Sequence, residues 1–167
     1  RVQDSAEGIA HALGLARNFA NNDKIIVILG DNITTSPIKP YVENFLRQED
    51  GARVLLKEVL DPSRFGVAAL DEKSVIEIQE KPDNPKSNYA VIGYYMYDSN
   101  VFDIIDSMEK SDRGEYEITD VNNEYLKRKQ LKVEIMGRGM AWLDAGTSDA
   151  LLSVAQFIKM LEDRRVI

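Results

Sequence analysis

Two segments of the chain place an aspartate directly after a short apolar run: "VILGDN" with Asp31 and "WLDAGT" with Asp144. Carboxylate oxygens are the ligands that Mg²⁺ prefers in proteins. Two carboxylates that hold one cation suit phosphoryl or nucleotidyl transfer, in which the metal and the positioning of substrates supply most of the catalysis. The residues alone leave a second interpretation open, because Asp31 can form a turn and Asp144 can cap the loop before the last helix.

A third segment, "QEKP", places Glu80 beside Lys81 at the end of a predicted strand. Lys81 can pair with a phosphate while Glu80 accepts hydrogen bonds from sugar hydroxyls. Adjacent strand residues point to opposite faces, but Pro82 stops the strand and lets the backbone change direction. A solvated charge pair is the alternative. In "RFGV", Gly66 allows a ligand to approach the backbone closely, and a bulge or turn is the alternative there.

Hydrophobic periodicity and turn signals predict the elements that must position these residues. The run "KIIVILGD" is apolar throughout, which is typical of a parallel strand buried on both faces. The polar connection "DEKS" between two strands predicts a hairpin. Helices are predicted over residues 8–19, 38–50, 100–108, 117–130 and 148–165, and strands over residues 24–31, 52–61, 65–71, 74–82, 88–99 and 131–136.

Helices and strands alternate in the first third of the chain, and antiparallel strands follow. This order predicts an α/β fold, a Rossmann-like three-layer sandwich with a mixed, mostly parallel sheet. Residues 1–167 are expected to form a single domain. Ligands of open α/β sheets bind outside the carboxyl ends of the strands, and Asp31 stands at such an end.

Composition restricts the classes of partner. Hydrophobic residues make up 44% of the 167 residues and charged residues 29%, as in ordinary globular proteins. The net charge of −7 argues against nucleic acid as a partner. The absence of cysteine excludes disulfides and thiolate metal sites. No apolar run approaches the roughly 20 residues that span a bilayer, so we expect no membrane partner and a cytoplasmic location.

Six segments in this order resemble the sugar-1-phosphate nucleotidylyltransferases: "GIAHAL", "ILGDN", "FGV", "EKP…PKSNYAVIGYYMYD", "RGEYEITDVNNEYL" and "WLDAGT". The resemblance covers nearly the whole chain from Gln3 onward. It implies the nucleotidyltransferase fold and transfer of a nucleotidyl group from dTTP to glucose 1-phosphate, giving dTDP-glucose and pyrophosphate. Alternatives are UTP as the nucleotide, another hexose phosphate, and a nucleotide-sugar-binding module without catalysis.

The resemblance also implies roles for individual residues. It places Mg²⁺ between Asp31 and Asp144 and makes these two residues and Lys81 the catalytic set. Gln3 and Gly8 correspond to the residues that read the pyrimidine base, since a glutamine amide both donates and accepts hydrogen bonds. Asn32 corresponds to a further nucleotide contact, and the sugar-phosphate contacts correspond to Gly66, Glu80, Lys81 and Val91.

The sequence departs from the family pattern at its start. The family begins with a strand and a glycine-rich loop of the form GGxGTRL, which cradles the triphosphate. We expect such a βα segment to precede Arg1, and we expect the 167 residues alone not to catalyse at a useful rate. Phe65 and Ile92 stand where Tyr and Thr are common in the family, so the sequence does not determine which sugar phosphate is bound. Family members form homo-oligomers, and a tetramer or dimer is expected of the complete protein.

Overall fold

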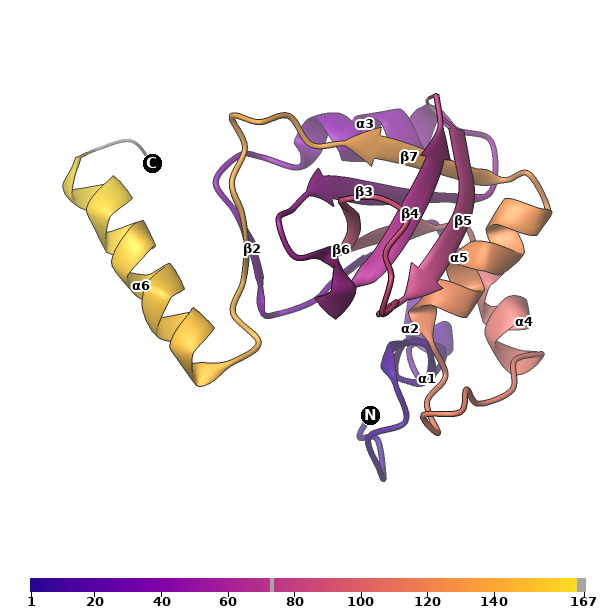
Figure 1. The fold of residues 1–167 in the computed structure, drawn as a ribbon. Coiled ribbons are helices and arrows are strands. Elements are labelled where there is room, and N and C mark those ends of the chain that lie inside the picture. Colours follow the sequence, from indigo (N-terminus) through magenta and orange to yellow (C-terminus); the bar gives the residue numbers. More distant parts are fainter. Residues whose placement is uncertain (73, 165–167) are drawn as a thin grey trace.

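The computed structural model describes residues 1–72 and 74–164 (Figure 1). Lys73 of the predicted hairpin connection and Arg165 of the predicted last helix lie outside the described residues. The helices are α1 (Ile9–Gly14), α2 (Arg17–Ala20), α3 (Lys39–Arg47), α4 (Val101–Asp106), α5 (Ile118–Lys127) and α6 (Ser148–Asp163), with the 3-10 turn η1 (Pro62–Arg64). The strands are β1 (Ile25–Ile28), β2 (Asn32–Thr34), β3 (Ala52–Glu58), β4 (Gly66–Asp71), β5 (Ser74–Glu80), β6 (Tyr89–Tyr97), β7 (Leu131–Ile135) and β8 (Trp142–Asp144).

Six strands form one sheet. Five of them follow the order β5-β4-β6-β3-β7, and the sixth, β1, pairs with the same edge of β6 as β4 does, further along that strand. The mixed sheet is confirmed, and β4 and β5 form the predicted hairpin. The expectation of a mostly parallel sheet is wrong, because among the described strands only β3 and β7 pair in parallel. The antiparallel strand β6 separates β3 from β1 and β4. An apolar run predicts burial, but it does not encode the direction of a partner strand that comes much later in the chain.

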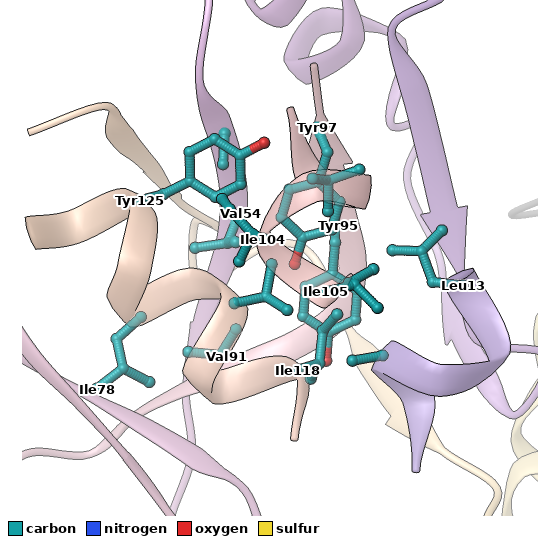
Figure 2. Close-up of a cluster of buried hydrophobic side chains, with 14 of the residues drawn as sticks. Leu13, Val54, Ile78, Val91, Tyr95, Tyr97, Ile104, Ile105, Ile118 and Tyr125 are labelled. Atoms are coloured by element: carbon teal, nitrogen blue, oxygen red, sulfur yellow. The ribbon is translucent and has the colours of Figure 1, made fainter. Parts of the chain in front are cut away.

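The strands β3 and β6 divide their side chains between two cores, which gives the predicted three layers. Tyr95 and Tyr97 face a core covered by α1, α4 and α5, whereas Tyr94 and Met96 face a core covered by α3. Figure 2 shows the first core, where Tyr97 and Tyr125 stack with ring centroids 5.7 Å apart. This alternation follows from the two-residue period of a strand.

Two features near the N-terminus differ from the sequence-based expectation. The predicted helix over residues 8–19 is two short helices, α1 and α2, with a break at Leu15 and Ala16. Because the break resets the helical period, Phe19 is 92% exposed and does not join the apolar face. β1 is half-buried on one face only, and Ile26 and Ile28 on its other face are exposed because no helix covers that side of the strand among the described residues.

A buried carboxylate ties the two ends of this core together. Asp98 follows β6 and accepts hydrogen bonds from the Gly51 backbone N–H (2.6 Å), the Tyr125 hydroxyl (2.6 Å), and the backbone N–H and side-chain amide of Asn100 (both 3.0 Å). Burial and the hydrogen bond to Asp98 raise the pKa of Tyr125, so its hydroxyl remains a donor. The network joins the start of β3, the start of α4 and the last turn of α5.

Replacing Asp98 by alanine is expected to lower the free energy of unfolding by about 3 kcal/mol, because buried donors lose their acceptor. Chemical denaturation monitored by circular dichroism measures the change. Asp112→Ala is the control, since Asp112 is exposed. An equal effect of both substitutions would contradict a structural role for the Asp98 network.

β2 and β8 pair outside the main sheet, and α6 leads away from it (Figure 1). Thr147 caps α6 by accepting a hydrogen bond from the backbone N–H of Ala150 (3.2 Å). None of the described helices has the length and apolarity that a membrane span requires.

Candidate active site

The site lies at a break in the edge of β6. β1 pairs with residues 94–97 of β6 and β4 pairs with residues 90–91, so neither strand pairs with the segment between them. At the break, the Leu29 N–H donates to the Gly93 carbonyl (2.9 Å), and the chain then turns into β2. Where β1 and β4 leave the edge, side chains from the turn after β1, the end of β5, β6 and β8 enclose a cleft of about 310 Å³.

This cleft brings together most of the residues that the sequence singled out. They come from the turn after β1, the start of β4, the end of β5, β6 and β8, and therefore from segments far apart in the chain. The cleft is lined by Asp31, Asn32, Gly66, Glu80, Lys81, Val91 and Asp144. Gln3 and Gly8 are not among them.

Asp31 and Asp144 converge because β2 and β8 pair. Asn32 lies opposite Asp144 in the register, and the Ala145 N–H donates to the Asp31 carbonyl (2.8 Å). A methyl group on Gly146 would lie 3.2 Å from Asp31 Oδ2 and 3.1 Å from Asp144 Oδ1, so glycine leaves both oxygens open to one small volume. No third His, Cys, Asp or Glu joins them within residues 1–72 and 74–164. Two carboxylates fit Mg²⁺, which keeps several waters and takes its remaining ligands from phosphates.

Asn32 connects this pair to the sheet. Its Oδ1 accepts hydrogen bonds from the Gly93 N–H (2.9 Å) and from Trp142 Nε1 (2.7 Å). Its Nδ2 donates to Asp31 Oδ1 (2.8 Å), which leaves Asp31 Oδ2 facing the cleft. Among the described residues, the main role of the Asn32 side chain is therefore to orient Asp31.

Glu80 and Lys81 reach the same cleft although they are adjacent. β5 ends at Glu80, and Lys81 has a left-handed backbone with φ of 41°, a conformation that costs a non-glycine residue about 1 kcal/mol. The turn cancels the alternation of a strand, so both side chains line the cleft. Glu80 Oε2 accepts a hydrogen bond from the buried Thr119 hydroxyl (2.6 Å).

Gly66 keeps the floor of the cleft open near Glu80. A methyl group there would lie 3.1 Å from Thr119 Oγ1 and 3.4 Å from Glu80 Oε2. Val91 is the partner of Gly66 in the β4–β6 register. Tyr95 lies beneath, and burial, followed by the carboxylates of Glu80 and Asp31, raises the pKa of its hydroxyl. The hydroxyl therefore stays protonated and can donate to a ligand.

Two arginines of the cleft were not among the candidates from sequence. Arg64 Nη2 lies 3.5 Å from Asp144 Oδ2, and Arg113 Nη1 lies 3.5 Å from Glu80 Oε1 and 3.4 Å from Glu117 Oε1. Both stand in segments that the sequence did single out, "RFGV" and "RGEYEITD". Their spacing in the sequence did not distinguish them as candidates, because arginines and lysines are common at loop positions. Together with Lys81 they offset the acidic groups and can attract phosphate.

Gln3 and Gly8 line a second, larger cleft of about 790 Å³ that shares Ile9 and Leu29 with the first. Gly8 has φ of 92°, and a methyl group there would lie 2.5 Å from the Tyr116 carbonyl oxygen, so a side chain is excluded. The two clefts adjoin along the carboxyl end of β1. One elongated ligand can therefore extend from Gln3 to Lys81.

The cleft places paired carboxylates at the end of a strand with cations beside them, within an α/β fold. The chain belongs to the nucleotidyl transferase family, which matches residues 1–160. It is 42% identical over 165 residues to the glucose-1-phosphate thymidylyltransferase of Mycolicibacterium smegmatis, covering 98% of this chain and 57% of that relative. The chain thus spans little more than half the length of the curated relatives it matches.

Similar solved structures agree with this family assignment. A crystal structure from Bacillus anthracis, assigned as a glucose-1-phosphate thymidylyltransferase and in complex with sucrose, is 55% identical with a TM-score of 0.85, covering 92% of this chain and 61% of that chain. UDP-glucose pyrophosphorylase complexed with UDP-glucose has a TM-score of 0.84 at 23% identity, covering 95% and 64%, and shows the shared fold. The resemblance to the sugar-1-phosphate nucleotidylyltransferases is confirmed.

Proposed function

We propose that the complete enzyme containing this chain transfers a thymidylyl group from dTTP to glucose 1-phosphate. The observation that carries the proposal is a single cleft with the Asp31–Asp144 pair on one side and Glu80 and Lys81 on the other. A phosphate oxygen of glucose 1-phosphate attacks the α-phosphorus of dTTP. The new phosphorus–oxygen bond forms as the bond to pyrophosphate breaks, giving dTDP-glucose.

The residues divide this work by position. Lys81 pairs with the phosphate of the sugar and reduces its repulsion from the triphosphate. Glu80, held by Thr119, accepts hydrogen bonds from sugar hydroxyls. Asp31 and Asp144 would hold Mg²⁺, which when bound neutralises charge on the triphosphate. Gly66 and Val91 shape the sugar side of the cleft, and Gln3, Gly8 and Asn32 contact the nucleotide.

Pyrophosphate release from purified complete enzyme tests the proposal. We expect turnover with dTTP, glucose 1-phosphate and Mg²⁺, and a lower kcat/KM with UTP. The names of the relatives favour dTTP, but the two bases differ by one methyl group, which is worth only about 1–3 kcal/mol. A higher kcat/KM with UTP would make the enzyme a uridylyltransferase. Binding of dTDP-glucose without turnover would instead support a nucleotide-sugar-binding module.

The 167 residues expressed alone are expected not to release pyrophosphate at a useful rate. We propose that the loop that cradles the triphosphate comes from another part of the complete enzyme. The same assay, run on both polypeptides at equal concentration, measures the difference. Equal rates would show that the described clefts suffice for catalysis.

The homo-oligomer and the cytoplasmic location stay predictions. Light scattering on the complete enzyme tests the homo-oligomer.

Gly93→Ala in the complete enzyme is expected to lower kcat by about tenfold, since small misplacements of catalytic groups are costly. The added methyl group would lie 2.7 Å from Asn32 Cγ and displace the amide that orients Asp31. Gly137→Ala is the control, because nothing lies within 4 Å of a methyl group there. If Gly93→Ala kept the wild-type kcat, Asn32 would not act through Asp31.

A further inference from the structure

The only histidine of the sequence, His11, touches Gln3. Gln3 Nε2 lies 3.2 Å from the Gly8 carbonyl oxygen and 3.0 Å from His11 Nδ1. His11 belongs to α1, and its ring lies 5.9 Å from the Tyr116 ring. Neither the cleft of Asp31 nor the roles proposed above use this histidine.

These contacts determine which end of the Gln3 amide faces the cleft. A carbonyl oxygen can only accept, so the Gln3 atom beside the Gly8 carbonyl must be the nitrogen. The second hydrogen of that nitrogen points to His11, and Nδ1 must therefore be the unprotonated, accepting nitrogen of the ring. Both donors of the amide are then engaged, whereas Gln3 Oε1 accepts no hydrogen bond from another described residue.

The second cleft thus offers one acceptor and one donor side by side. The acceptor is Gln3 Oε1. The donor is the Gly8 N–H, which makes no hydrogen bond to the rest of the described chain. Thymine and uracil present N3–H beside a carbonyl oxygen, which complements this pair. Cytosine presents an accepting N3 beside an amino group, which opposes it at both positions.

We propose that His11 is a positioning residue that holds the Gln3 amide with its oxygen toward the base, and so makes the site selective for pyrimidines with an N3–H. The proposal rests on the proposed function, in which Gln3 and Gly8 read the base. Without the Nδ1 acceptor, only the Gly8 carbonyl still holds the amide nitrogen in this orientation, so the Gln3 amide turns more readily and presents its nitrogen, which suits cytosine.

Charged side chains surround His11. Glu7 Oε2 lies 3.4 Å from the same Nδ1, and Lys110 binds Glu7 Oε1 at 3.0 Å. Asp106 lines the same small cavity as His11 and pairs with Arg17. Among these neighbours, Gln3 Nε2 is the donor that the unprotonated Nδ1 accepts at 3.0 Å.

Calorimetric titration of the complete enzyme with dTTP and with dCTP tests the proposal, because binding does not require turnover. Three proteins are compared: wild type, His11→Phe, which keeps a ring against Tyr116 but has no acceptor, and His11→Asn, whose side-chain oxygen accepts near the position of Nδ1. We expect the ratio of the two dissociation constants to fall about tenfold in His11→Phe and to recover in His11→Asn.

The outcomes separate the two proposals. An unchanged ratio in His11→Phe overturns the role of His11, as does a His11→Asn variant that loses selectivity to the same extent. The dissociation constant for glucose 1-phosphate serves as the internal control and should not change in either variant. Selective binding of dTTP without pyrophosphate release would contradict the proposed function and leave the role of His11 intact.

Discussion

Replacing Asp31 by asparagine in the complete enzyme is expected to lower kcat by about 10²–10³-fold, because the site would lose one of the two charges that we propose hold a cation at the reacting phosphate. Asparagine keeps the size of the side chain, and its Oδ1 can still accept from Asn32 Nδ2. The effect should therefore report the charge of Oδ2 and not a collapse of the turn. Asp144→Asn should cost about as much for the same reason.

The double variant sharpens this prediction. Residues that act as one unit are not additive, so Asp31→Asn with Asp144→Asn should be little slower than either single variant. Rates measured over a titration of Mg²⁺ should show that each single variant binds the metal more weakly than wild type. Asp149→Asn, on the exposed first turn of α6, is the matched control and should behave as wild type. Wild-type kcat in Asp31→Asn would remove this residue from the site.

Replacing Lys81 by methionine is expected to lower kcat/KM for glucose 1-phosphate by about 10²-fold. Methionine keeps most of the length of the side chain and removes the charge that we propose faces the attacking phosphate. The KM for dTTP should change little, because the proposed site offers the triphosphate other cations, Arg64 and the metal. Steady-state kinetics with each substrate varied in turn separates the two effects.

Lys86→Met is the control for Lys81→Met. Lys86 follows the same strand and pairs with Glu77, where it lowers the pKa of that exposed carboxyl. Its loss should leave both KM values unchanged. If Lys81→Met weakened both substrates equally, Lys81 would support the fold of the cleft and not the sugar phosphate.

Much of the local structure could be predicted from sequence because its causes are local. The β4–β5 hairpin has its polar connection, and α3 and α6 have their periodicity. The end of the strand that became β1 put Asp31 where ligands of α/β sheets bind, whereas the short strands β2 and β8 were not predicted. The prediction of one helix over residues 8–19 was wrong because the apolar periodicity continues through Ala16 although the helical backbone is interrupted there. The predicted parallel direction of β1 was wrong because burial does not specify strand direction.

The sequence by itself determined the residue types of the site and, through their order, the family. Only the tertiary structure decided which of them meet. β2–β8 pairing brings Asp31 to Asp144, the left-handed turn brings Lys81 to the side of Glu80, and a short contact joins His11 to Gln3. Strand pairing depends on backbone hydrogen bonds, which nearly every residue can make and which therefore leave no distinct mark in a sequence. The turn at Lys81 and the contact between the Gln3 and His11 side chains depend on how the surrounding chain packs, which their own residue types do not specify.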